Sequence, residues 1–542
     1  MLGFCIAFTV VLAILGYLGY QAAMRIEPFI REQTALYLRQ RFDSEVEIGR
    51  FDVGMSSPLS GLLSWPPSWP VEWDSLWSLI AERGRGGRVA IDISDIALRH
   101  KGRRDLPALM AMKKISFVVN VDDALREPPR IRRILIDGLD INIPPKGERP
   151  GISAGNAPPA ESAPPITKAS TVVIDQVVIS NANLKLLPRN QRKPPLEFDI
   201  QRIRLDGAGP GLPFVYDASL VNAKPPGQIE SSGKFGPWVA DEPGESAIEG
   251  EYIFQNADLG VFKGVAGILN STGKFQGQLN RIIADGETDT PDFRLTSSGN
   301  AMPLHTKFHA VIDGTNGNTA LEPVEALLGK TKFTARGSVD RDPDKPARSM
   351  LFYVLMKDGR VDDVLRLAMK GDKTMLTGGM NLDMRLHIIP ESGDLADRLN
   401  LSGTFELVSA SFTSDQVQQK IDELSRKGQG RPKDTAIANV ASNFYGDFKL
   451  DRGVFDLHRL EFDVPGALVQ LNGNYLFKTE AIDFHGQLRL QAKLSKTQTG
   501  WKRILLTPVD PFFAKEGAGT LLKIQVVGTR SAPQFGLDKA KK

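Results

Sequence analysis

The chain contains very little cysteine and histidine, which limits the chemistry that it can perform. Cys5 is the only cysteine among 542 residues, so neither an internal disulfide nor a cysteine metal site can form within the chain. Of the six histidines, His305 and His309 are four residues apart, but their segment favours a strand and no carboxylate pattern completes a ligand set. We therefore expect no metal and no cofactor.

A strong excess of one charge and a complete catalytic motif are also lacking. The 67 Lys and Arg against 64 Asp and Glu give a net charge of +3, and the charges are interspersed, which argues against a nucleic-acid partner. Gly329, Lys330 and Thr331 resemble the end of a phosphate-binding loop, but Val324 stands where the first glycine is required. We find no G-x-S-x-G elbow and no paired carboxylates. We expect that the protein is not an enzyme, with an unrecognised hydrolase as an alternative.

Long apolar runs are absent except at the N-terminus. Residues 2–20 carry no charge, and as a helix they would span roughly 28 Å, close to the thickness of a bilayer core. This predicts an uncleaved transmembrane anchor at 1–25, with a cleaved signal peptide as the alternative. Arg25 and Arg31 follow the run and weakly favour a cytoplasmic body by the positive-inside rule.

What the sequence has in abundance is alternation of apolar and polar residues. A period of two predicts β-strands with one apolar and one polar face. The best examples are 380–388 and 481–494, whose apolar residues are Met380, Leu382, Met384, Leu386, Ile388, Ile482, Phe484, Leu488, Leu490 and Leu494. Recurrent glycines, including those at 233, 273, 403 and 473, are expected in or beside strands, at bends or close backbone approaches. Helices are predicted only at 26–42, 256–268, 361–370 and 414–427.

An internal repeat joins 131–143 to 174–186, with apolar residues at matching positions. Each copy is predicted to form two short strands around a turn, at 137–138 and 180–181. The segment 144–168 between the copies is rich in Pro, Gly, Ala and Ser and is predicted to be disordered.

Four of the six tryptophans fall in an insertion at 56–87, spaced by four residues beside prolines. Tryptophan favours membrane–water interfaces, which suggests a membrane-proximal element. The alternative is a loop with a short helix whose rings pack on the sheet. The interface candidates are Trp65, Trp69, Trp73 and Trp77.

Three stretches of the chain together form a family pattern. The first is the N-terminal apolar run followed by VEIGRFDV, and the second is the pair IRRILIDGLDINIP and IDQVVISNANLKL. The third is a C-terminal module from NFYGDFKLDRGVFDLHRLEFDVPGALVQLNGNYLF through AIDFHGQLRL to the closing pattern G-T-x-L-x-I-x-V-x-G-T-x-x-x-P-x-F. Together they cover about half of the chain, and they resemble the AsmA-type family of Gram-negative bacterial envelope proteins. The insertion at 56–87 and the segment at 144–168 are not part of this pattern.

The resemblance implies a single-pass inner-membrane protein with its body in the periplasm, and this outweighs the weak charge signal. It also implies a mostly β fold, in which an elongated, twisted antiparallel sheet curls into an open apolar groove with few short helices. The implied role is phospholipid transport and outer-membrane integrity, with phospholipids and the inner membrane as partners and other envelope proteins left open. The residues expected to line the groove are Met380, Leu382, Met384, Leu386, Ile388, Ile482, Phe484, Leu488 and Leu490.

The predicted divisions of the chain follow from these features. They are an anchor at 1–25, an AsmA-like region at 26–143, the segment at 144–168, a central β-groove at 169–400 and a C-terminal AsmA-like module at 401–542. The main alternative function is a structural or assembly factor for outer-membrane proteins, in which the apolar side chains form a filled β core. In a filled core those side chains pack against other protein side chains, whereas in an open groove they remain accessible to a ligand.

Overall fold

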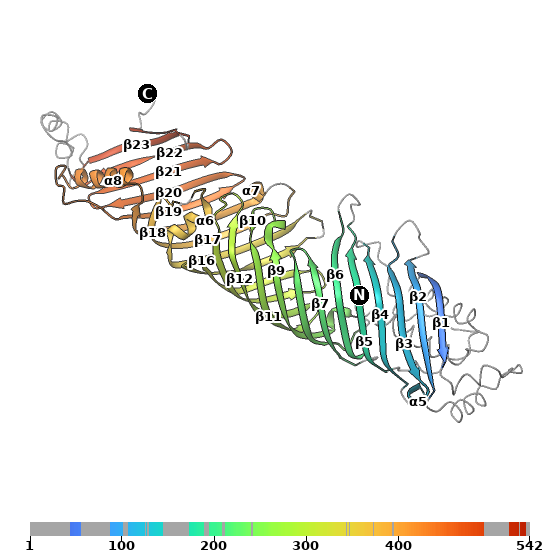
Figure 1. Cartoon of the computed structure of the whole chain (residues 1–542). Helices are drawn as coiled ribbons and strands as arrows, with labels where there is room; N and C mark the ends of the chain where they lie inside the picture. Colours follow the sequence, from blue (N-terminus) through green and yellow to red (C-terminus); the bar gives the residue numbers. More distant parts are fainter. Residues whose placement is uncertain are drawn as a thin grey trace, which may run out of the picture. The chain divides into compact units, whose positions relative to one another are not determined.

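The structure is a computed structural model (Figure 1). Apart from a few single residues, it describes residues 44–55, 87–100, 107–144, 173–188, 194–208, 212–239, 242–492, 520–529 and 532–537. The predicted anchor at 1–25, the helix at 26–42, all four interface tryptophans and nearly all of 144–168 lie outside the described residues. None of the helices in the described part is long and apolar enough to cross a membrane.

The fold is mostly β, as the alternation predicts. Strands make up 70% of the described residues, and hydrogen bonding joins 24 of them into one sheet. No pairing connects β1 to β24 among these strands, so the described sheet is open. Two compact units divide the chain: unit 1 comprises Met1–Ala257 and Thr272–Ile282, and unit 2 comprises Asp258–Ser271 and Ile283–Lys542.

In unit 1, each strand pairs with the next along the chain. The strands are β1 (Ser44–Met55), β2 (Arg88–His100), β3 (Met110–Asn120), β4 (Arg130–Ile143), β5 (Val173–Leu186), β6 (Leu196–Ala208), β7 (Phe214–Ala223), β8 (Pro226–Phe235) and β9 (Ala247–Asp258). The short helix α5 (Val121–Ala124) follows β3, and the 3₁₀ turn η2 (Pro243–Glu245) precedes β9.

One expectation for unit 1 is wrong. Each repeat copy forms one continuous strand, β4 or β5, in place of two strands around a turn. These two strands pair in parallel, whereas the other pairs of unit 1 are antiparallel. Gly138 and Asn181, at the expected turn positions, adopt left-handed backbone angles within their strands, with φ of 66° and 53°. These residues produce a local irregularity and not a reversal of the chain.

The apolar side chains of unit 1 form a dry core. A row of cross-strand partners runs over β2 to β6 as Ile93, Ile115, Ile136, Ile179 and Ile203. Register partners lie on the same face of a sheet, so this row shows one apolar face continuing from strand to strand. All five side chains are buried.

Within the described residues, unit 2 holds most of the remaining strands and the two helices of eight or more residues. The strands that begin at or after Asp258 are β10 (Val265–Ala266), β11 (Ile268–Gln278), β12 (Arg281–Leu295), β13 (Met302–Asp313), β14 (Asn318–Leu328), β15 (Thr331–Arg341), β16 (Arg348–Arg360), β17 (Leu376–Ile388), β18 (Leu399–Phe412), β19 (Ser442–Asp451), β20 (Val454–Val464), β21 (Ala467–Leu476), β22 (Ala481–Leu490), β23 (Thr520–Thr529) and β24 (Ala532–Leu537).

Of the three helices predicted within the described residues, two are present. Helices α6 (Val361–Ala368) and α8 (Asp415–Gly428) lie within or next to the predicted segments 361–370 and 414–427, and a single turn, α7, spans Leu395–Arg398. The helix predicted at 256–268 is wrong: this segment ends β9, turns through η3 (Leu259–Val261) and forms β10. Gly260 and Gly264 favour such turns over a continuous helix.

The glycines at 233, 273, 403 and 473 all lie in strands, as expected.

Candidate functional site

The most distinctive feature of unit 2 is a broad face of its sheet that carries no charged side chain. Register partners across β15 to β23 form continuous rows of apolar residues and glycine, and we call this surface the inner face. The row through Leu386 consists of Gly337, Phe352, Leu386, Leu401, Leu450, Phe455, Tyr475, Ile482 and Gly528. The row through Met384 consists of Ala335, Val354, Met384, Gly403, Phe448, Leu457, Gly473, Phe484 and Val526.

Two further rows continue this surface toward the other ends of the strands. The row through Leu382 contains Met356, Leu382, Phe405, Gly446, Leu460, Leu471, Gly486 and Ile524. The row through Met380 contains Gly359, Met380, Leu407, Phe444, Phe462, Val469, Leu488 and Leu522. From strand spacing, nine strands extend over roughly 38 Å, and the stretch of β17 from Met380 to Leu386 extends over about 20 Å.

The inner face therefore brings together the two segments that the alternation singled out. Met380 shares a row with Leu488, Met384 shares one with Phe484, and Leu386 shares one with Ile482. Leu382 lies in the row that crosses the second segment at Gly486. The remaining two residues lie on the same face: Ile388 pairs with Met350 and Leu399, and Leu490 pairs with Ala467.

The opposite face of the same strands is polar. One row there contains Arg336, Tyr353, Arg385, Ser402, Lys449, Asp456, Asn474 and Asp483. The Arg336 guanidinium lies over the Tyr353 ring, 5.7 Å from its centroid. An antiparallel sheet with one polar face normally buries its other face. We therefore expect the inner face to be covered by other groups.

The two helices cover only one end of the inner face. Val364 and Leu365 of α6 pack against the cluster that contains Met380 and Leu382, while Ile421 and Leu424 of α8 pack against the cluster that contains Leu490. Met380, Leu382 and Leu490 are accordingly buried. At the other end, the side chains of Phe352, Met384, Leu386, Ile388, Phe455, Tyr475, Ile482 and Phe484 remain partly exposed. The inner face thus has a dry end and an open end.

Both helices are held in place by polar contacts. The side-chain amide of Asn300 donates to the carbonyl oxygens of Arg366, Met369 and Gly371 at 2.8–3.0 Å, at the C-terminal end of α6. In α8 the buried stripe is polar: Asp422 accepts hydrogen bonds from the backbone N–H groups of Asn439 and Val440 at 3.0 and 2.9 Å. Val417, an apolar residue of this helix, is exposed.

Glycines allow neighbouring strands to approach closely on the inner face. At Gly403 an added Cβ atom would overlap the carbonyl oxygen of Asp383, and at Gly473 it would overlap that of Asp483. The backbone of the neighbouring strand therefore occupies the space that a side chain would need. Gly403 pairs with Phe448 and Gly473 with Phe484, so a large ring lies beside each missing side chain. The sequence analysis found both glycines and missed their aromatic partners, because the pairing register was unknown.

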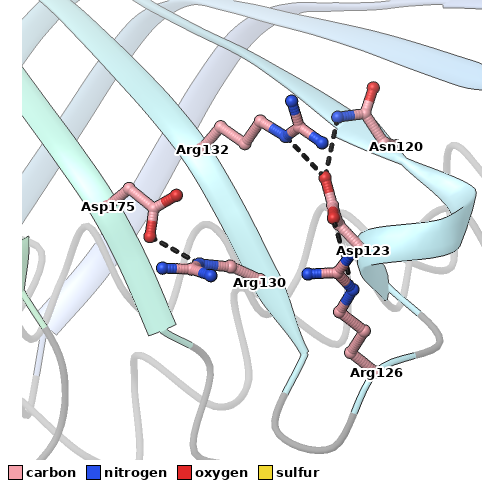
Figure 2. A network of polar contacts seen from close by, with 6 residues as sticks. All are labelled: Asn120, Asp123, Arg126, Arg130, Arg132 and Asp175. Carbon is pink, nitrogen blue, oxygen red and sulfur yellow. Dashed lines mark hydrogen bonds and ion pairs between the residues drawn. The ribbon is translucent and has the colours of Figure 1, made fainter.

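A polar network in unit 1 offers a second, different kind of site (Figure 2). The buried Asp123 carboxylate accepts hydrogen bonds from Arg132 Nε at 2.7 Å and Asn120 Nδ2 at 2.9 Å, and pairs with Arg126 at 3.6 Å. The hydrogen bond from Arg132 is the main cause that lowers the pKa of Asp123, and the one from Asn120 is next. These partners stabilise the ionised form of the Asp123 carboxylate. Asp123 is therefore suited to linking β3 to β4 and not to proton transfer.

The histidines are placed apart from any metal-binding arrangement. His305 and His309 both lie on β13, and His309 Nδ1 is 2.7 Å from the carboxylate of Asp285. Within the described part of the chain, His, Cys, Asp and Glu form no group of three that could hold a metal ion. No family model, curated protein or solved structure matches the chain.

Proposed function

We propose that this protein binds phospholipid acyl chains on the inner face of unit 2 and serves lipid transport and outer-membrane integrity as an inner-membrane-anchored periplasmic protein. The observation that carries the proposal is the set of uninterrupted apolar rows across β15 to β23, whose open end is left partly exposed. The membrane and periplasmic parts rest on the family resemblance and on the apolar run at 2–20.

Acyl chains suit this surface in size and chemistry. Each leaflet of a bilayer contributes about 15 Å of hydrocarbon, half of the roughly 30 Å core, and the inner face is wider than this in both directions. Burying a methylene group is favourable by about 0.8 kcal/mol, so a chain laid on the rows would be held without any specific polar contact. A charged headgroup would remain at the ends of the strands, where polar residues begin.

The dry core of unit 1 favours a second candidate function, that of a structural or assembly factor. There Ile91, Leu98, Ile115 and Ile134 are at most 2% exposed, which leaves no room for a ligand beside them. Under this alternative the open end of unit 2 would receive a segment of an outer-membrane protein. The two functions therefore differ in what is bound to the inner face.

Lipid bound to the purified protein distinguishes them. We expect native mass spectrometry of the full-length chain, extracted in detergent, to show co-purified phospholipid. Leu386→Asp should abolish this while lowering the melting temperature only modestly, because water can reach the open end. Leu355→Asp, on the polar face of β16 where Leu355 is 42% exposed, is the matched control and should keep its lipid. A folded Leu386→Asp variant with unchanged lipid content would refute the proposal.

A further inference from the structure

The inner face does not stop at the strand ends but continues onto an exposed turn. Tyr475 is the last inner-face residue of β21, and Phe477 follows it in the turn 477–480 that leads to β22. Their rings contact each other edge to face, with centroids 5.1 Å apart. Phe477 is 55% exposed, so the apolar surface ends on an aromatic ring that projects into solvent.

A second turn lies directly beside this one. The backbone N–H of Phe477 donates to the carbonyl oxygen of Gly453 at 3.0 Å, which joins the turn between β19 and β20 to the turn between β21 and β22. Val454, next to Gly453, pairs with Leu476 and therefore lies on the face opposite to Tyr475. Val454 is 41% exposed. The joined turns are thus apolar on both sides of the sheet.

Cations flank these apolar side chains. Arg452 and Lys478 are exposed, and neither makes an ion pair with another described residue. The acidic residues in the same turns are Asp451, which pairs with Lys449 at 3.7 Å, and Glu480. We call Arg452, Val454, Tyr475, Phe477 and Lys478 the tip patch.

This combination fits a lipid surface better than a protein surface. A protein partner would cover the apolar side chains on only one side of the joined turns. A turn that enters a membrane is surrounded by lipid, so the side chains on both sides are covered. Aromatic rings are favoured at that boundary, and unpaired Arg and Lys beside them attract anionic headgroups. The rings of the tip patch are continuous with the inner face.

We propose that the tip patch docks unit 2 on a bilayer that carries anionic lipids, with Phe477 inserted at the level of the headgroups. Docking there would place the open end of the inner face against the membrane, so that an acyl chain could move along Phe477 and Tyr475 onto the rows. The docking itself does not depend on the proposed function, whereas the movement of an acyl chain onto the rows rests on it. Membrane docking and lipid content are measured separately.

A local fluorescent probe tests the docking in the full-length chain kept soluble in a non-ionic amphipol. Cys5→Ser removes the only cysteine, and Phe477→Cys then accepts an NBD label. With vesicles of phosphatidylcholine and phosphatidylglycerol, we expect the emission to shift to shorter wavelength as the label leaves water. The same label at Leu355→Cys, on the polar face, should not respond even if another part of the chain inserts.

The cations provide the second arm of the test. In the protein labelled at 477, Arg452→Gln and Lys478→Gln should each raise the lipid concentration for half-maximal response roughly fivefold. Lys357→Gln, a cation at the α6 end of β16, is the matched control and should leave this concentration unchanged. An NBD label at 477 that stays in water with anionic vesicles, or a response as large at 355, would overturn the proposal.

Discussion

The side-chain amide of Asn181 donates a hydrogen bond to the Asp137 carboxylate across the parallel pair β4–β5, with 2.7 Å between nitrogen and oxygen. Asn181 is the repeat equivalent of Gly138, and both have left-handed backbone angles. Repeat-equivalent residues, such as Ile131 and Ile174, are also direct register partners. The two copies are therefore related by a translation across the sheet, and translated strands run parallel.

Substitutions of Asn181 should separate backbone conformation from hydrogen bonding. Asn181→Val places a β-branched residue at a left-handed position and should lower the free energy of unfolding by about 2–3 kcal/mol. Asn181→Gly keeps the conformation and loses only the exposed hydrogen bond, so its effect should be about 1 kcal/mol or less. Urea unfolding of the detergent-solubilised chain measures both. Equal losses in the two variants would show that the left-handed conformation is not what matters.

Gly403 should be intolerant of even one added carbon atom. In Gly403→Ala the Cβ would overlap the Asp383 carbonyl oxygen, so β17 and β18 must shift, at a cost of about 2–4 kcal/mol. Gly54→Ala is the matched control, because its Cβ would meet only Ala90 Cβ at 3.8 Å. Its effect should stay within about 0.5 kcal/mol. Similar melting temperatures for the two variants would mean that β17 and β18 do not approach each other so closely at Gly403.

The strands were predictable from the sequence because one face of each is apolar. The segments at 380–388 and 481–494 show this clearly, and they correspond to β17 and to β22, which ends at Leu490. Which residues lie side by side was not predictable, because register depends on bulges such as the one between Met356 and Gly359. The repeat did contain one usable signal: a translated copy with a connection of nearly 30 residues permits the parallel pairing of β4 and β5 that we observe.

The helices show a different limit. Helical spacing correctly located α8, but it did not reveal that the buried side chains of this helix are polar. The side of α8 that is buried is determined by backbone groups that need hydrogen-bond partners. One of them is the N–H of Val440, which donates to Asp422. A carboxylate in the middle of a helix is normally assigned to solvent. Its burial here follows from a loop whose path the sequence does not reveal.

The Asp123 network should contribute to stability in a pH-dependent manner (Figure 2). The folded-state pKa of Asp123 is lowered, so its contribution is fully present above the unfolded value of about 3.9 and is lost as the pH falls through the folded value. At pH 7, Asp123→Asn should cost about 2 kcal/mol. The difference from the unmodified chain should shrink steadily below about pH 4. Urea midpoints at pH 7 and pH 3 measure this, and a difference that is independent of pH would contradict it.

Asn300 should control how firmly α6 covers the dry end of the inner face. Its side-chain N–H groups satisfy carbonyl oxygens at the end of α6, and that helix lies over Met380. Asn300→Ala leaves these carbonyls without their donor, which should cost about 1–2 kcal/mol. Because the loss falls on one short helix, local opening should become about 5- to 30-fold more frequent, while the strands beneath stay protected.

Hydrogen exchange followed by mass spectrometry would detect this opening in peptides that cover 361–368. Asn316→Ala is the matched control, since the Asn316 side chain bonds to Asp313 within the turn between β13 and β14 and does not contact α6. Unchanged exchange in 361–368 would show that α6 is held by its apolar contacts alone.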